Sequence, residues 1–239
     1  MKTVVIFGGS GFIGQNIIRR LAKKNYRILV PYQRHINNQP KLRLFGNVGQ
    51  IIPLKFQSLE DKIIQNIIEE SNLIINLKTI WQEKESHSYK NDIFNFNKSL
   101  VDLIISIDIN KHLFFFSGLG VSENSSSKRT KFIAKTEQYI SNNLVNTSII
   151  RPSIVVGEND KFFSTLVPIF KFSFLIPLFG SGETQLQPVF VDDIARAVEI
   201  IIEKKFNGNH IYELVGTEKF SYKSLYQFIS EQLGLKRLL

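Results

Sequence analysis

Glycine recurs at every third position in a short segment near the amino terminus, at Gly8, Gly11 and Gly14. The preceding run VVIF is typical of a buried strand, and the following segment has the apolar spacing of a helix. At such a junction Gly8 permits a tight turn, Gly11 lets a pyrophosphate approach the backbone, and Gly14 lets the helix pack closely. The N–H groups that begin the helix, at Phe12 and Ile13, would face the phosphates. The spacing predicts a dinucleotide-binding site, with a purely structural turn as the alternative.

The end of the second predicted strand, residues 26–34, bears on the choice of nicotinamide cofactor. An acidic side chain there would hydrogen-bond the ribose 2′-hydroxyl of NAD(H) and repel the 2′-phosphate of NADP(H). The segment instead ends in Gln33 and Arg34, and a guanidinium makes charge-assisted, bidentate contacts with phosphate. The sequence therefore favours NADP(H) over NAD(H), although Arg34 could equally be a solvated loop cation.

The composition is that of an ordinary globular protein and limits the other kinds of site. The 239 residues are 43% hydrophobic and 21% charged, which is enough to build a full core. There is no cysteine, so we expect no disulfide, and we expect no metal centre because the histidines are scattered, at His35, His87, His112 and His210. The net charge of +9 would suit an anionic partner, or it could reflect AT-biased coding. We expect no nucleic-acid binding because no basic block is interleaved with aromatic residues.

Alternating strand and helix patterns must position these residues. Strands are predicted at 4–7, 26–34, 50–57, 72–80, 111–120 and within 147–157, and helices at 12–24, 58–71, 92–110 and 131–143. This order implies an α/β fold with a Rossmann-type, doubly wound parallel sheet that binds ligands at the carboxyl ends of its strands. We expect an NAD(P)-binding Rossmann domain over residues 1–160. A small carboxyl-terminal lobe would follow over 161–239, with 185–205 returning to the Rossmann core.

One strongly apolar stretch, residues 162–180, could be mistaken for a membrane span. Lys171 in its middle, together with Pro168 and Pro177, argues against a spanning helix. It is interpreted either as a buried helix and loop of the small lobe or as an exposed aromatic docking surface. We expect no signal or transit peptide, since the first strand begins within three residues of Met1, and we expect the protein in the cytoplasm.

Further motifs accompany the glycines: Asn97 in the predicted helix 92–110, Ser117 after the fifth strand, and the segments IIRPSIVVG and QPVFVDDIARAV. Together they resemble the extended short-chain dehydrogenase/reductase superfamily of NAD(P)-dependent epimerases and dehydratases over nearly the whole chain. VVIFGGSGFIGQNIIRRL, NVGQIIPL and RPSIVVGENDKFF are most similar to its atypical branch, the nucleotide-binding accessory subunits of respiratory complex I and their bacterial relatives. Members of that branch continue beyond LGLKRLL, so by this resemblance the chain is a shortened member or a truncated copy.

The resemblance implies a catalytic Tyr-x-x-x-Lys pair, in which the tyrosine is the acid/base and the lysine holds the ribose hydroxyls. Lys135 matches the lysine, but Lys131 occupies the tyrosine position, so the proton donor is missing. Tyr139 lies one turn further on, in the wrong direction. Ser117 matches the serine that hydrogen-bonds a substrate carbonyl, with a small strand-end residue as the alternative.

The resemblance also implies additional cofactor contacts. Asn97 matches an asparagine of the long helix, although it could be an ordinary surface residue. Lys78 stands where the superfamily usually has a small residue beside the cofactor, and a lysine there could reach the pyrophosphate. The full set of predicted cofactor-binding residues is Gly8, Gly11, Phe12, Ile13, Gly14, Gln33, Arg34, Asn97 and Lys135.

These features support functions of different classes. The first is a non-catalytic, NADP(H)-loaded accessory or assembly subunit of a membrane-associated respiratory NADH dehydrogenase complex, located in the cytoplasm or peripherally on the inner face of the membrane. The alternative is an NADP-dependent oxidoreductase, epimerase or dehydratase that acts on a carbonyl, quinone-like or nucleotide-sugar substrate. A cofactor-binding redox sensor would use the same fold.

Overall fold

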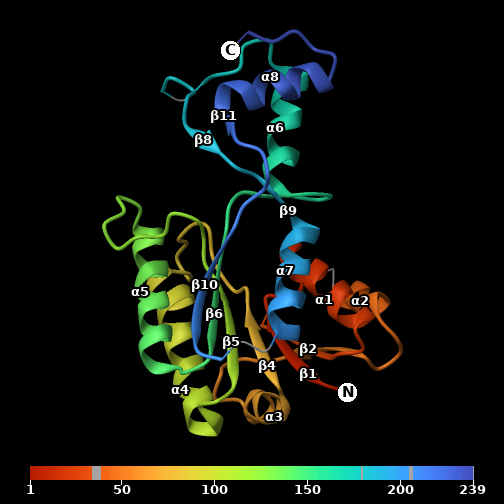
Figure 1. Cartoon of the computed structure of the whole chain (residues 1–239), viewed down its shortest axis with the longest axis vertical. Helices are drawn as coiled ribbons and strands as arrows, with labels where there is room; N and C mark the ends of the chain where they lie inside the picture. Colours follow the sequence, from red (N-terminus) through yellow and green to blue (C-terminus); the bar gives the residue numbers. More distant parts are fainter. Residues whose placement is uncertain (34–38, 179, 205–206, 239) are drawn as a thin grey trace.

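A seven-stranded parallel sheet forms the centre of the larger part of the molecule (Figure 1). The computed structural model describes residues 1–33, 39–178, 180–204 and 207–238. The strand order is β10-β6-β5-β4-β1-β2-β3. The strands are β1 (Thr3–Phe7), β2 (Arg27–Tyr32), β3 (Ile51–Lys55), β4 (Leu73–Asn76), β5 (His112–Phe116), β6 (Thr147–Pro152) and β10 (Asn209–Leu214). The prediction of a Rossmann-type, doubly wound α/β fold is confirmed.

The central strands are buried because helices cover both faces of the sheet. Every residue of β1 and β4 is buried, and Val5 pairs with Leu29 of β2 and Ile74 of β4. Continuous β-branched and apolar runs suit this position, since both sets of side chains meet a hydrophobic layer. The carboxyl ends of β1, β2 and β4 consequently lie at the same edge of the sheet, where a ligand would bind.

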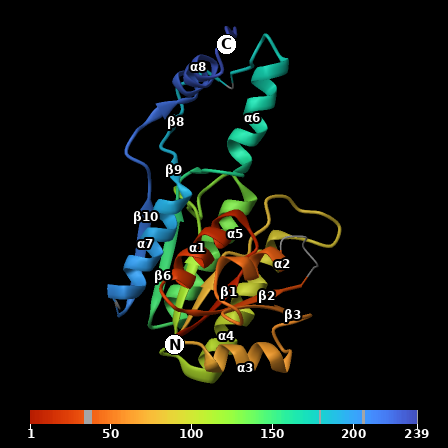
Figure 2. The same ribbon diagram turned by 90° about the vertical axis from the view of Figure 1, so that its right-hand side faces the viewer.

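The two helical layers come from different parts of the chain (Figure 2). One layer contains α1 (Phe12–Lys23), α2 (Gln39–Leu42), the short 3₁₀ helix η1 (Arg43–Phe45) and α7 (Val191–Lys204). The other contains α3 (Lys62–Glu70), the π-helical segment η2 (Lys90–Asn95), α4 (Phe96–Asp108) and α5 (Lys128–Asn143). The late helix α7 packs on α1, where Glu199 pairs with Arg20 and lies 2.7 Å from Lys24 Nζ.

A smaller lobe stands beyond the sheet (Figure 1). It contains α6 (Lys161–Phe172), α8 (Tyr222–Gln232) and the antiparallel pair β8 (Gln185–Leu186) and β11 (Phe220–Ser221). A separate hydrophobic cluster holds it together, formed by Phe170, Ile176, Leu225, Tyr226 and Ile229. At the junction, β7 (Val155–Val156) pairs with β9 (Val189–Phe190). The division at residue 160 stays a prediction.

Several element boundaries differ from the predicted ones. β4 ends at Asn76 and β5 at Phe116, so Lys78 and Ser117 lie in the loops that follow these strands. The π-helical turn η2 starts at Lys90, before the predicted helix 92–110, and includes the first residues of that helix. β10 was not predicted; it is an edge strand whose residues alternate between exposed and half-buried positions, and so lacks the apolar run of a central strand.

The apolar stretch 162–180 combines both proposed environments. Phe170 is buried in the lobe, whereas Phe172, Phe174 and Leu175 are 92%, 68% and 60% exposed. Among the residues that the structure describes, no helix is both long and apolar enough to cross a bilayer.

Candidate dinucleotide-binding site

The glycine turn between β1 and α1 has the geometry that its spacing predicts. Gly8 has a φ of +75°, a conformation that favours glycine, and its carbonyl accepts a 3.0 Å hydrogen bond from the Gly11 N–H. A Cβ atom on Gly14 would lie 2.6 Å from Gly9 Cα and 2.7 Å from the Gly8 oxygen. Residue 14 must therefore be glycine for α1 to approach the turn this closely.

The start of α1 is open to an anion. Gly11 is the exposed N-cap residue, it supplies no capping side chain, and the first turn contains no acidic residue. A Cβ atom placed on Gly11 would have one described atom within 4 Å outside the two neighbouring residues. That atom is the Gly8 oxygen, at 3.2 Å. The N–H groups around Phe12 and Ile13 thus combine an accessible backbone with the positive end of the helix dipole.

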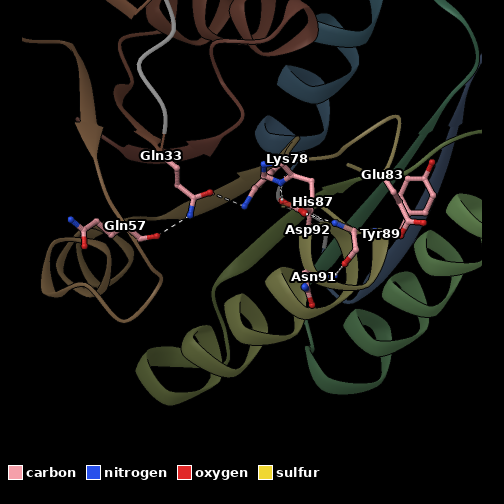
Figure 3. Close-up of polar contacts among 9 residues, drawn as sticks. Gln33, Gln57, Lys78, Glu83, His87, Tyr89, Asn91 and Asp92 are labelled. Carbon is pink, nitrogen blue, oxygen red and sulfur yellow. Dashed lines mark hydrogen bonds and ion pairs between the residues drawn. The ribbon is translucent and has the colours of Figure 1, made fainter. Parts of the chain in front are cut away.

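Gln33 lies just beyond β2, at the predicted ribose position. Its Nε2 donates a 2.9 Å hydrogen bond to the Gln57 carbonyl, and its Oε1 accepts a 2.9 Å bond from Lys78 Nζ (Figure 3). Arg34, which carried the preference for NADP(H) in the sequence, lies outside the described residues. Its contact with a 2′-phosphate stays a prediction.

A buried amide pair fixes the end of β4. Asn76 Nδ2 donates to Asn97 Oδ1 over 2.7 Å, and Asn97 Nδ2 donates to the Ile93 carbonyl of η2 over 2.7 Å. Asn76 Oδ1 in turn accepts a 2.9 Å bond from the Lys78 N–H. Asn97 is 1% exposed, so the interpretation of Asn97 as a surface residue is wrong. A direct contact between Asn97 and a cofactor stays a prediction.

The residues at the predicted catalytic positions lie on the loop after β5 and on α5. The Ser117 N–H donates to the Ile150 carbonyl over 2.8 Å, whereas its buried Oγ has no hydrogen-bond partner in the described part of the chain. Lys131 and Lys135 are exposed one turn apart on α5, and Lys135 Nζ lies 4.5 Å from the centroid of the Phe94 ring. Ser117 Oγ is thus buried without a hydrogen-bond partner among the described residues, and the predicted position of the catalytic tyrosine on α5 holds an exposed lysine, Lys131.

Sequence reasoning missed the contacts that hold the loop after β4 against α5. Arg129 Nε donates to the Ile80 carbonyl over 2.9 Å, and its guanidinium carbon lies 4.2 Å from the centroid of the Trp81 ring. Lys128 Nζ lies 2.7 Å from a carboxylate oxygen of Glu83, and this hydrogen bond lowers the pKa of Glu83. No spacing in the sequence relates these residues, which are about 45 to 50 positions apart.

Comparison with known protein families identifies the family of this chain. Residues 4–140, more than half of the chain, match the NAD dependent epimerase/dehydratase family. The chain belongs to this family. The predicted resemblance to extended short-chain dehydrogenases/reductases is therefore confirmed.

The curated relatives of this family member include respiratory-chain proteins. "NADH dehydrogenase [ubiquinone] 1 alpha subcomplex subunit 9, mitochondrial" of Arabidopsis thaliana is 28% identical over 95% of the chain and 57% of its own length. The protein with the same description in Dictyostelium discoideum is 27% identical, over 94% of the chain and 62% of its own length. The chain thus spans less than two thirds of these relatives.

Solved structures of epimerase type have the same fold. MoeE5 in complex with UDP-glucuronic acid and NAD superimposes with a TM-score of 0.79 at 14% identity, over 98% of this chain and 83% of that one. A UDP-N-acetylglucosamine 4-epimerase from Methanobrevibacter ruminantium gives 0.76 at 20% identity, over 98% and 82%. At these identities the similarity establishes the fold alone.

Proposed function

We propose that this epimerase/dehydratase family member is an NADP(H)-binding accessory or assembly subunit of a respiratory NADH dehydrogenase complex and is not catalytic on its own. The observation that carries the proposal is on α5: an exposed lysine, Lys131, occupies the position of the family's acid/base tyrosine. No phenol hydroxyl is therefore present at the position of the family's general acid, and Lys131 is exposed on the surface of the helix. The names of the curated relatives support a role in a respiratory complex.

The bound nucleotide would keep the larger part of the protein in one conformation. The glycine turn, the open start of α1 and the neutral Gln33 at the end of β2 support a dinucleotide. The segment 26–34 contains no acidic residue, which supports NADP(H) over NAD(H). Retained rather than consumed, such a ligand would stabilise the fold by mass action and present an ordered surface to a partner.

The proposed partner surface is the far end of α6 in the small lobe. Phe172, Phe174 and Leu175 are exposed there beside Lys171. The Leu238 N–H donates to the Phe174 carbonyl over 3.1 Å, which brings Leu238, itself 59% exposed, to the same place. Exposed large apolar side chains that cluster in this way mark interaction sites. We place the protein at the inner face of the membrane, where a respiratory complex would hold it peripherally.

Native purification tests this proposal. A chromosomal affinity tag on the protein, followed by extraction in mild detergent, should recover subunits of an NADH dehydrogenase complex together with bound NADPH. The control is the same tag on an unrelated member of the epimerase/dehydratase family from the same cells. Recovery of the tagged protein alone, without respiratory subunits, would contradict the accessory role.

The second candidate is a working NADP-dependent oxidoreductase, epimerase or dehydratase. The buried Oγ of Ser117 has no hydrogen-bond partner among the described residues, which favours this function, because a substrate carbonyl would accept a hydrogen bond from such a hydroxyl. A purified protein that rapidly oxidises NADPH with an aldehyde, ketone, quinone or nucleotide sugar would favour this function over the accessory role.

A further inference from the structure

Lys78 follows β4, yet its side chain reaches the end of β2. Its Nζ donates a 2.9 Å hydrogen bond to Gln33 Oε1 (Figure 3). In the sheet, β1 lies between β4 and β2, so this bond joins two strand ends on either side of the strand that leads into the glycine turn. The cation therefore lies over the edge of the sheet at which a dinucleotide binds.

Neighbouring groups hold Lys78 in this orientation. Its N–H is fixed by Asn76 Oδ1, and Asn76 is fixed in turn by the buried Asn97. Its Nζ lies 3.8 Å from the centroid of the Phe96 ring, which screens one side of the ammonium from water and attracts it. A Cβ on Gly8 would lie 3.1 Å from the Lys78 nitrogen, so the backbone of Lys78 lies against the glycine turn.

The contact with Gln33 places the charge at the ribose end of the site. In a Rossmann fold the residue at the end of the second strand meets the ribose 2′-hydroxyl, and a nearby cation accommodates a 2′-phosphate. Gln33 has that position, its amide nitrogen is bound to Gln57, and Lys78 Nζ is one hydrogen bond from its amide oxygen. That Lys78 could reach the pyrophosphate stays a prediction.

We infer that Lys78 and Gln33 form a subsite for the 2′-phosphate of NADP(H), in which the Lys78 ammonium supplies a selective charge. The inference rests on the proposed binding of a dinucleotide. A phosphate oxygen replaces Gln33 Oε1 as the acceptor for Lys78, which exchanges a hydrogen bond to a neutral amide for a stronger, charge-assisted one. The Gln33 amide, which is neutral and already bonded to the Gln57 carbonyl beyond the end of β3, does not repel the phosphate.

Two adenosine fragments and the two dinucleotides test the subsite by calorimetric titration. The fragments 2′,5′-ADP and 5′-AMP differ only by the 2′-phosphate, and we expect the wild-type protein to bind 2′,5′-ADP about 10-fold or more tightly than 5′-AMP. Lys78→Met should weaken binding of NADPH and 2′,5′-ADP about 10- to 100-fold and change binding of NADH and 5′-AMP by less than about 2-fold, as expected for loss of a bond to a charged group. Lys78→Arg should retain most of the selectivity.

Lys98→Met is the matched control, because Lys98 is an exposed lysine of α4 that pairs with Asp102, 2.8 Å away. It should leave all four affinities unchanged. Equal weakening of NADPH and NADH by Lys78→Met would overturn the subsite and place the lysine at the pyrophosphate, and an unchanged NADPH affinity would overturn it outright. If the wild-type protein binds neither dinucleotide, the proposed function fails as well, so the two failures are distinguishable.

Discussion

Tyr139 donates a 2.7 Å hydrogen bond from its hydroxyl to Asp102 Oδ1, which ties α5 to α4. The bond to a carboxylate stabilises the neutral phenol and raises the pKa of Tyr139. Lys98 Nζ also lies 5.3 Å from the centroid of its ring. The phenol of α5 is thus engaged one turn beyond Lys135 and is a weaker acid than an ordinary tyrosine, so we expect that it does not substitute for a tyrosine at position 131.

The first prediction follows for catalysis. The wild-type protein should retain bound NADPH, because a hydride leaving the nicotinamide would put negative charge on a substrate oxygen without a phenol to protonate it. A positioned general acid contributes about 10² to 10⁴ in rate. Lys131→Tyr restores the Tyr-x-x-x-Lys spacing and should yield trace turnover at most. Single-turnover absorbance at the nicotinamide band, across aldehydes, ketones, quinones and nucleotide sugars, measures this.

Tyr139→Phe is the matched variant for that experiment, since it removes the phenol of α5 and leaves Lys131 and Lys135 in place. It should leave the absorbance traces unchanged. Rapid oxidation by the wild-type protein that is abolished by Ser117→Ala or Lys135→Ala would contradict the non-catalytic proposal.

Substitutions at two glycines of the first turn should have separate effects on stability and on cofactor binding. Gly14→Ala places a Cβ against Gly9 Cα and the Gly8 oxygen, which are backbone atoms that cannot rotate away, and should lower the free energy of unfolding by about 1 to 3 kcal/mol. Gly11→Val adds a branched side chain at the exposed N-cap, so the protein should fold but lose both cofactors. Denaturant unfolding of the nucleotide-free proteins and calorimetric titration give the two quantities.

Of the two variants, Gly11→Val is the sharper test of cofactor binding at the glycine turn. Circular dichroism must first establish that Gly11→Val is folded. A folded variant that binds NADPH as the wild-type protein does would reduce the glycine turn to a structural role.

The sequence was sufficient to predict those features of the fold and the site that depend on a local pattern of residues. The buried run before Gly8 and the three-residue glycine spacing predict the turn, since both depend on neighbours along the chain. The bond between Lys78 and Gln33 joins residues 45 positions apart through a flexible side chain, and no periodicity encodes it. The burial of Asn97 likewise depends on its partner Asn76, 21 positions away. The glycine turn of the candidate site was therefore predictable, and the side-chain contacts between distant residues around it were not.

His112 should make the stability of the protein depend on pH. Burial lowers its pKa to about 4, with a smaller effect from His210, and its Nε2 lies 2.9 Å from Ser148 Oγ. The folded-state pKa is below the ordinary value of about 6.5, so the unfolded chain binds the proton first as the pH falls. The contribution of the neutral His112 to the free energy of unfolding is therefore complete above pH 6.5 and is lost between pH 6.5 and 4. This contribution is on the order of 2 kcal/mol after allowance for the partial exposure of His112.

His112→Gln isolates this contribution because glutamine can keep a hydrogen bond to Ser148 but does not titrate. The difference in unfolding free energy between the wild-type protein and the variant, measured in urea from pH 7.5 to 4, should change with pH in that interval. A difference that is independent of pH would mean that His112 is protonated as readily in the folded protein as in the unfolded chain.

The exposed end of α6 should be needed for assembly and not for folding. Phe172 and Phe174 are 92% and 68% exposed, so replacing both with serine removes few internal contacts and should change the free energy of unfolding by less than about 0.5 kcal/mol. If these rings dock onto a respiratory complex, the double variant should lose the co-purifying subunits while it still binds NADPH, because the dinucleotide site is built at the sheet. Leu44→Ser, at an 81% exposed position on η1, is the control and should keep the subunits. Retention of the subunits by the double variant at wild-type yield would assign docking to another face of the protein.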